Sequence, residues 1–79
     1  MDKVYILFTC NEWKDYASMR IAGVFDSLEQ LKEGIKTCCL AGLMQFDGNA
    51  CNQTFDLQAL NERMTYGYAN KYKINELLI

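Results

Sequence analysis

The sequence contains no histidine and no proline, and it has no long apolar run. Histidine is the commonest general base and the commonest metal ligand, so its absence removes the simplest routes to acid–base catalysis and to a metal site. The longest unbroken apolar stretch is far shorter than the roughly 18 residues that a membrane-spanning helix needs. We therefore expect no membrane span, no metal and no cofactor.

The chain also has no large excess of charge of either sign. The formal net charge is −2 and the isoelectric point is near 4.9. Such a chain has no basic field with which to hold phosphates, so nucleic acid is not an expected partner. The charge is also too small for an acidic protein that imitates DNA.

The cysteines do not form a recognisable site. Cys10, Cys38, Cys39 and Cys51 contain no Cys-x-x-Cys pair, which is the spacing that zinc and thioredoxin-like sites use. An even number of cysteines permits a disulfide framework, but no signal-peptide pattern precedes the first apolar run. We expect reduced, mostly buried cysteines in a cytoplasmic protein.

The length and composition predict one small domain that covers residues 1–79. Apolar residues make up 51% of the 79 positions and aromatic residues 13%, which argues against disorder. A chain of this size buries only about 60–65% of its unfolded surface. Binding to a partner or to a second copy would therefore add to a marginal stability.

The first third of the chain predicts two paired strands. Val4–Cys10 is short, almost entirely apolar and rich in β-branched and aromatic residues, as in a strand covered on both faces. A second strand is expected from about Ser18 to Phe25, with Ile21 and Phe25 on one face and Val24 on the other. The segment between them is too short for a crossover helix, so the strands should pair antiparallel.

A helix is predicted to follow the second strand. Ser27 and Gln30 form a Ser-x-x-Gln capping box at its start. Gly34 interrupts the helix and indicates that another group approaches its backbone closely. After Lys36 the segment is apolar almost all round, which predicts burial by a second helix or by another subunit. The core-facing residues recur at helical spacing: Leu28, Leu31, Ile35, Cys38 and Gly42.

The rest of the chain is expected to contain a loop, a short helix and a last strand. Residues 45–54 are typical of a loop, and Asp47-Gly48-Asn49 within it is predicted to be a plain turn, because most ligands of a calcium loop are missing. Asp56 is placed to cap a helix from Leu57 to about Met64. Tyr72–Ile79 is expected to form the last strand.

An alternative for this region is a hairpin of Met64–Tyr68 and Tyr72–Leu78 around Ala69 and Asn70. In both cases the predicted fold class is α+β. The order is β-β-α-(α)-β, with a mostly antiparallel three-stranded sheet packed by one or two helices.

A polar segment between the first two strands contains the first candidate contact site, Trp13, Lys14, Tyr16 and Arg20. Tryptophan and tyrosine are over-represented at binding hot spots because they bury much area with few rotatable bonds. The two basic side chains are suited to pairing with an anion. The alternative is that Trp13 folds back over the sheet edge and that Lys14 and Arg20 pair with neighbouring carboxylates.

A second candidate patch combines Tyr66, Tyr68 and Tyr72 with Lys71 and Lys73. Interleaved aromatic and basic residues can stack on bases and hold a nucleic-acid backbone, although the net acidity of this chain argues against that use. The alternative is that the tyrosines pack on the sheet with their hydroxyl groups in water.

No residue set in the sequence resembles a catalytic centre. Cys10 is the obvious candidate nucleophile, but the chain has no histidine to activate it. An enzyme is therefore the least expected class.

The segment from Cys10 to Arg20 has the pattern Cys-x-Glu-Trp-Lys-x-Tyr-x-Ser-Met-Arg, and Gly23-Val24-Phe25 follows it. This pattern resembles one found in short uncharacterised proteins that phages and prophages of gut bacteria encode. The resemblance covers mainly residues 3–36 and brings no catalytic residue with it. It implies a binding role, because phage accessory proteins of this size often inhibit host defence systems by binding them.

Two functions remain as hypotheses. The first is a non-enzymatic, homodimeric binding protein that blocks a protein partner from the host, because one face of a three-stranded sheet would leave apolar surface to be covered. The second is a protein that sequesters a nucleotide or signalling molecule, because the first candidate site offers stacking together with anion pairing.

Overall fold

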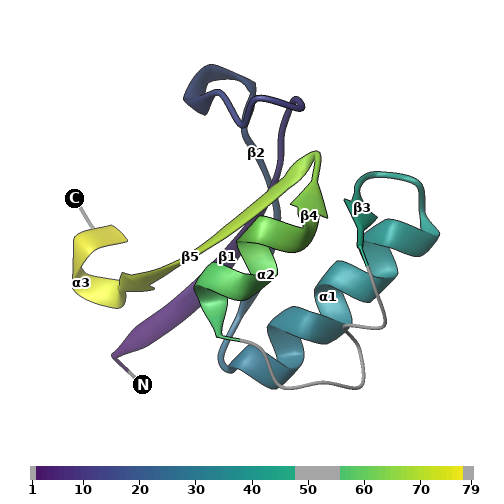
Figure 1. The fold of residues 1–79 in the computed structure, drawn as a ribbon. Helices are drawn as coiled ribbons and strands as arrows, with labels where there is room; N and C mark the ends of the chain where they lie inside the picture. Colours follow the sequence, from purple (N-terminus) through teal and green to yellow (C-terminus); the bar gives the residue numbers. More distant parts are fainter. Residues whose placement is uncertain (1, 48–55, 78–79) are drawn as a thin grey trace.

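A three-stranded antiparallel sheet forms the centre of the protein, with its strands in the order β2-β1-β5 (Figure 1). The structure is a computed structural model that describes residues 2–47 and 56–77. The sheet contains β1 (Lys3–Thr9), β2 (Arg20–Phe25) and β5 (Gly67–Lys73). Strand β1 pairs antiparallel with both neighbours, and two helices pack on one face of the sheet. The predicted α+β class and the predicted first hairpin are confirmed.

The central strand is buried from both sides, as its continuous apolar run predicts. Leu7 is fully buried in the main core beneath the helices. Val4 and Ile6 point to the opposite face of the sheet, because successive side chains of a strand alternate. They are nevertheless only 9% and 5% exposed.

Strand β2 contains a β-bulge that the sequence analysis did not predict. Leu7 pairs with Gly23 and Phe8 pairs with Ile21, so Ala22 is the extra residue. A bulge shifts the side-chain alternation by one residue. Ile21 therefore lies with Phe8 on the face away from the helices, while Phe25 lies on the helix side. The prediction that Ile21 and Phe25 share a face is wrong for this reason.

Helix α1 (Leu28–Leu40) begins where the capping box predicts. The hydroxyl oxygen of Ser27 accepts a hydrogen bond from the backbone N–H of Gln30 at 3.2 Å. The side-chain oxygen of Gln30 reaches back to the backbone N–H of Asp26, at 3.1 Å. Two N–H groups at the helix start are thereby satisfied. The predicted inner face is confirmed for Leu31, Ile35 and Cys38, which are buried, and for Leu28, which is half-buried. Gly42 lies beyond the end of the helix and is exposed, so it does not belong to this face.

Helix α1 ends in a Schellman motif around Gly42, whose φ is 78°. The N–H of Gly42 bonds to the carbonyl of Cys39 at 3.1 Å, and the N–H of Leu43 bonds to that of Cys38 at 2.9 Å. Leu40 and Leu43 nearby are 83% and 55% exposed. Cys38 and Met44 at this apolar end are buried in the core with Leu60 of α2, but the second helix does not bury the two leucines, so for them that alternative is wrong. Their cover by another subunit stays a prediction.

Helix α2 (Leu57–Arg63) has Asp56 as its N-cap, as predicted. A carboxylate oxygen of Asp56 accepts from the backbone N–H of Ala59 at 2.8 Å.

Residues 45–54 are not entirely a loop, because β3 (Gln45–Phe46) pairs antiparallel with β4 (Met64–Thr65). Gly48, Asn49 and Cys51 lie outside the described residues.

The last strand lies earlier in the chain than predicted. Strand β5 covers Gly67–Lys73, and a short helix α3 (Ile74–Leu77) follows it. Both the predicted strand Tyr72–Ile79 and the alternative hairpin are therefore wrong. Gly67 and Ala69 provide the buried side of β5, and such small residues give a weak apolar signal.

The hydrophobic core lies between the sheet and the two helices. Its largest fully buried side chains are Leu7, Leu31 and Leu60, one each from β1, α1 and α2. Cys10 and Cys38 are free thiols, and Cys38 is part of this core. No helix in the described part of the chain has the length and apolarity to cross a membrane.

Candidate functional site

The loop between β1 and β2 is built around the side chain of Asn11. Its amide oxygen accepts hydrogen bonds from the backbone N–H groups of Trp13 and Asp15, at 3.2 Å and 3.0 Å. Its amide nitrogen donates to the Asp15 carboxylate at 3.0 Å. The Ser18 hydroxyl accepts from the Asn11 N–H at 3.0 Å and donates to the Asp15 carbonyl at 2.7 Å. These bonds hold the loop backbone in a defined shape.

This loop presents two aromatic side chains to solvent. Trp13 is 73% exposed and Tyr16 is 89% exposed. Figure 1 shows the loop projecting from one end of the sheet, away from the helices. Trp13 does not fold back over the sheet edge, so the lid interpretation is wrong. Exposed aromatic rings on a well-ordered loop are typical of a contact surface.

The two basic residues of this candidate site are already engaged within the chain. The ammonium group of Lys14 donates to the backbone carbonyl of Asn61, at the end of α2, at 2.6 Å. The Arg20 guanidinium donates to the carbonyls of Ala17 and Met19, at 3.2 Å and 2.8 Å. Both side chains thus stabilise the loop rather than offering a ready anion site. Neither was predicted to bind backbone carbonyls.

The loop and strand β5 together enclose a hollow of about 440 Å³ on the sheet face away from the helices. We call this hollow the aromatic groove. It brings together Lys14 and Tyr16 from the first candidate site and Tyr68 and Tyr72 from the second. The complete lining is Phe8, Lys14, Tyr16, Met19, Tyr68, Asn70 and Tyr72.

Phe8 of the central strand organises the floor of the aromatic groove. Its ring stacks near that of Tyr68, with 6.4 Å between centroids, and meets the ring of Tyr72 edge-on at 6.5 Å. These separations are within the range of favourable aromatic pairs. The prediction that the tyrosines pack on the sheet fits Tyr68 and Tyr72. Tyr66 does not line the groove, and its φ of 66° marks the break between β4 and β5.

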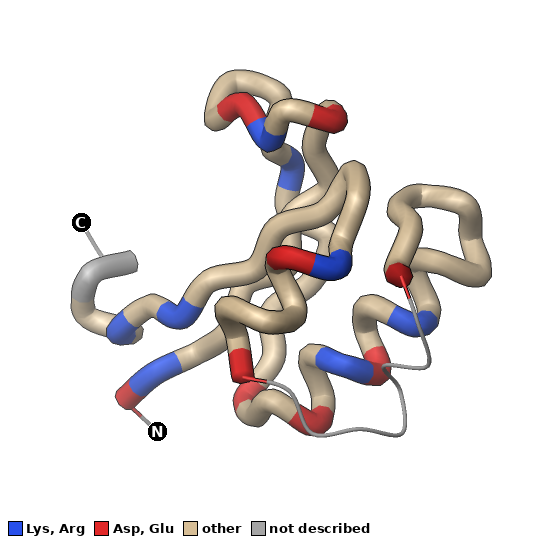
Figure 2. The backbone as a smooth tube through the Cα atoms, in the orientation of Figure 1, with Lys and Arg blue, Asp and Glu red and all other residues tan. Residues whose placement is uncertain are grey.

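The lysines of the second candidate patch point away from its tyrosines. Lys71 pairs in register with Tyr5, and its ammonium group lies 5.3 Å from the centre of the Tyr5 ring. Lys73 pairs with Lys3 on the same face as Lys71. Figure 2 shows basic segments of β1 and β5 close together near the two chain ends. The strand alternation therefore separates the aromatic and basic groups that a nucleic-acid surface would combine.

The side chain of Asn61 occupies the outer edge of β5 at Ala69. Its amide nitrogen donates to the Ala69 carbonyl and its amide oxygen accepts from the Ala69 N–H, both at 2.8 Å. The side chain thus takes the place that a neighbouring strand would occupy. Sequence reasoning missed this residue, because a polar residue on a helix gives no sign of pairing with a strand eight positions later.

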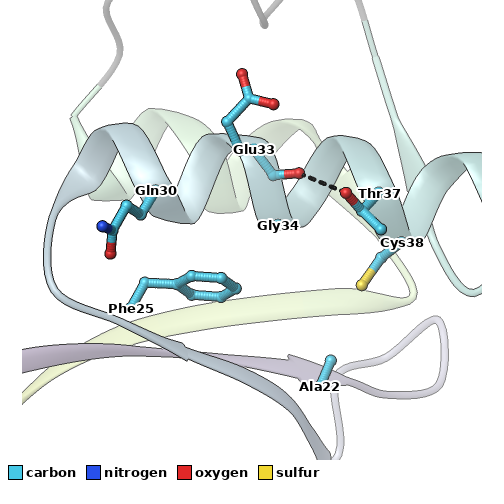
Figure 3. A pocket seen from close by; sticks show the side chains of 7 residues that line it. All are labelled: Ala22, Phe25, Gln30, Glu33, Gly34, Thr37 and Cys38. Carbon is cyan, nitrogen blue, oxygen red and sulfur yellow. Dashed lines mark hydrogen bonds between the residues drawn. The ribbon is translucent and has the colours of Figure 1, made fainter.

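A second hollow, of about 360 Å³, lies between α1 and β2 (Figure 3). The ring of Phe25 lies beneath Gly34, and the Thr37 hydroxyl donates to the Glu33 carbonyl at 3.0 Å. A Cβ atom at Gly34 would overlap the Phe25 ring. The close approach predicted at Gly34 is therefore confirmed, and the approaching group is an aromatic ring.

The thiols near these surfaces are poor nucleophiles. Burial raises the pKa of the Cys10 thiol above its ordinary value of 9.0, and the nearby Lys14 offsets this only in part. Burial also raises the pKa of the Cys38 thiol. Both groups are thus protonated at neutral pH, whereas a reactive cysteine needs its thiolate form. Among the described residues, no group of histidine, cysteine and acidic side chains is placed to hold a metal ion.

Fold and site together define a small α+β protein whose exposed features are an ordered aromatic loop and an aromatic groove. Comparison of the chain with protein-family models, with curated proteins and with solved structures finds no match. The function must therefore be argued from the geometry of these surfaces.

Proposed function

We propose that the protein is a non-enzymatic binding protein that blocks a protein partner through Trp13, Tyr16 and the adjoining aromatic groove. The observation that carries the proposal is the exposure of the two loop rings, 73% and 89%, on a backbone that the Asn11 hydrogen bonds hold in place. An ordered loop loses little conformational freedom when it binds, so more of the contact energy appears as affinity.

The partner is expected to offer an apolar pocket with a basic rim. Trp13 and Tyr16 are large enough to fill such a pocket, and aromatic anchors of this kind dominate the energy of many interfaces. Glu12 and Asp15 on the same loop are exposed carboxylates, which would face the rim and steer the approach of a basic surface. The resemblance to phage-encoded proteins makes a component of a host defence system the expected partner class.

The small-ligand alternative has weaker support. A groove of about 440 Å³ is large enough for a small molecule. However, an anionic nucleotide would need cations, and Lys14 and Arg20 are bonded to backbone carbonyls. A nucleotide in the groove would have to displace Lys14 from the Asn61 carbonyl, and Arg20 does not line the groove, so the protein partner remains the better-supported proposal.

The test is affinity capture of host proteins on three immobilised chains: wild type, the double variant Trp13→Ala with Tyr16→Ala, and Leu40→Ala. Leu40 is a matched control because it is 83% exposed and lies on α1. We expect the wild type and Leu40→Ala to retain the same protein and the double variant to lose it, since removing two anchor residues costs about 2 kcal/mol or more each.

Native mass spectrometry of the eluted wild-type chain separates the two functions. A complex with a protein of defined mass supports the proposal. A bound small molecule in place of a protein would support the sequestering function instead. Equal retention of the captured protein by the double variant would show that the loop is not the contact surface, and the proposal would be wrong.

A further inference from the structure

We infer that strand β2 is a dimerisation edge, which pairs antiparallel with β2 of a second copy of this chain to form a six-stranded sheet. This inference concerns assembly and does not depend on the function proposed above. It rests on the difference between the two edges of the sheet, on the side chains along β2 and on the charges at its two ends.

The two edges of the sheet are not equivalent. At the β5 edge, the Asn61 amide occupies both the N–H and the carbonyl of Ala69. At the β2 edge, no hydrogen bond from the rest of the described chain reaches the backbone of residues 21–24 on its outer side. An unpaired edge strand is a template for another strand. Residues 21–25 contain neither lysine nor proline, which commonly protect an edge, although the bulge at Ala22 interrupts the regular spacing of this edge.

The side chains of β2 fit a two-fold pairing in one register. Ile21 and Val24 point to the sheet face away from the helices, and Ala22 and Gly23 point to the helix side. Antiparallel pairing of Ile21 with Val24 of the second copy keeps every side chain on its own face, and the same register sets Ala22 opposite Gly23. Ile21 and Val24 are 66% and 56% exposed, so the pairing would cover apolar surface that the monomer leaves in water.

The ends of β2 carry complementary charges. In this register, Arg20 lies opposite Phe25 of the second copy, and the exposed Asp26 is the next residue. The Arg20 guanidinium has donors beyond the one nitrogen that bonds to the loop carbonyls. The two-fold axis brings opposite charges near each other in this way at both ends of the pairing. Two six-residue strands bury less area than a standard interface, so we expect dissociation in the micromolar range.

Sedimentation of the wild-type chain across low to high micromolar concentrations tests the dimer, together with two single variants. Val24→Lys places a charge opposite the apolar Ile21 of the second copy, where the pairing would remove that charge from water. Leu43→Lys is the matched control, because Leu43 is 55% exposed and lies beyond the end of α1. We expect a dimer for the wild type and Leu43→Lys, and at least a tenfold weaker association for Val24→Lys.

A monomeric wild type across this range would overturn the inference. A dimer that Val24→Lys leaves unchanged, or that Leu43→Lys weakens equally, would place the interface elsewhere and overturn it as well. Circular dichroism of each variant shows whether it is folded. If Val24→Lys is unfolded, disulfide cross-linking of Ile21→Cys with Val24→Cys chains tests the dimer instead.

Cysteine cross-linking tests the register. Residues directly opposite in an antiparallel pair have Cα atoms about 4.5–5.5 Å apart, which a disulfide can bridge. A mixture of Ile21→Cys and Val24→Cys chains should therefore form a covalent dimer under mild oxidation. Each variant alone should not, because its own cysteines would be offset by three positions, or about 10 Å. The wild-type chain is the control for cross-links between native thiols. If the mixture forms no more covalent dimer than the wild-type chain does, the proposed register is wrong.

Discussion

Replacing Gly34 with alanine should destabilise the fold, even though alanine is the better helix former. A Cβ atom at this position would overlap Cζ of Phe25 and come within 2.8 Å and 2.9 Å of its two Cε atoms. The ring also lies close to Gly23 on its other side, where an added Cβ would come within 2.6 Å of the same Cζ. The ring thus lies between Gly23 and Gly34, and Figure 3 shows it beneath Gly34.

The net effect is the difference between two opposing terms. Alanine in place of glycine within a helix gains about 1 kcal/mol of intrinsic propensity. Overpacking of a well-filled site typically costs about 1–3 kcal/mol, because the ring or the helix must shift. We therefore expect Gly34→Ala to lower the free energy of unfolding by about 1 kcal/mol, which corresponds to roughly 4–8 °C in Tm for a domain of this size.

Urea unfolding followed by far-ultraviolet circular dichroism measures this difference. Tryptophan fluorescence is a poor probe here, since Trp13 is already 73% exposed in the folded chain. The control is the same substitution in a Phe25→Leu background, where the ring is gone and alanine should stabilise the fold by up to about 1 kcal/mol. If Gly34→Ala stabilises the wild type as much as it stabilises Phe25→Leu, the close approach of the ring is not what requires glycine.

Two further predictions concern stability. Asn61→Ala should lower the free energy of unfolding by about 1–3 kcal/mol, because it leaves the N–H and carbonyl of Ala69 without their partner. The control is Gln58→Ala, a substitution of an exposed residue on the same helix. It should lower the free energy of unfolding by less than about 1 kcal/mol in the same urea titration. Alkaline pH should also weaken the fold, since burial raises the folded-state pKa of Cys38 above its ordinary 9.0. The folded state then holds the Cys38 thiol proton more tightly than the unfolded state does. The contribution of this thiol to the free energy of unfolding is therefore fully present below pH 9.0 and is lost as the pH rises through the folded-state pKa. Unfolding measured on both sides of that pH should show a smaller loss for Cys38→Ala than for the wild type, and an equal loss would contradict the assignment.

The features that sequence reasoning predicted well are local ones. The capping residues Ser27 and Asp56 begin their helices where expected, because a cap depends on atoms only three residues away. The apolar run of β1 identified the central strand for a similar reason. Each signal is concentrated in a short segment and does not depend on what the distant chain does.

The features that it missed depend on pairing between distant segments. The bulge at Ala22 becomes visible only in the register of β2 against β1. Strand β5 was not predicted at its observed position, because its buried side consists of Gly67 and Ala69, which have little apolar surface and so give a weak apolar pattern. The candidate site was predicted as two separate patches, and only the pairing of β1 with β5 brings Tyr68 to the loop that carries Tyr16.

The amide of Asn61 also limits how far copies of this chain can add to one another. A sheet with two open edges can accept a neighbour at each edge, and repeated addition then has no natural end, as in a cross-β fibre. Here one edge is already occupied by an amide of the same molecule. Among the described residues, addition through β2 would use the open edge of the three-stranded sheet in each molecule and would stop at two, because the Asn61 amide occupies the opposite edge at Ala69. A single side chain would then separate a closed pair from an open filament.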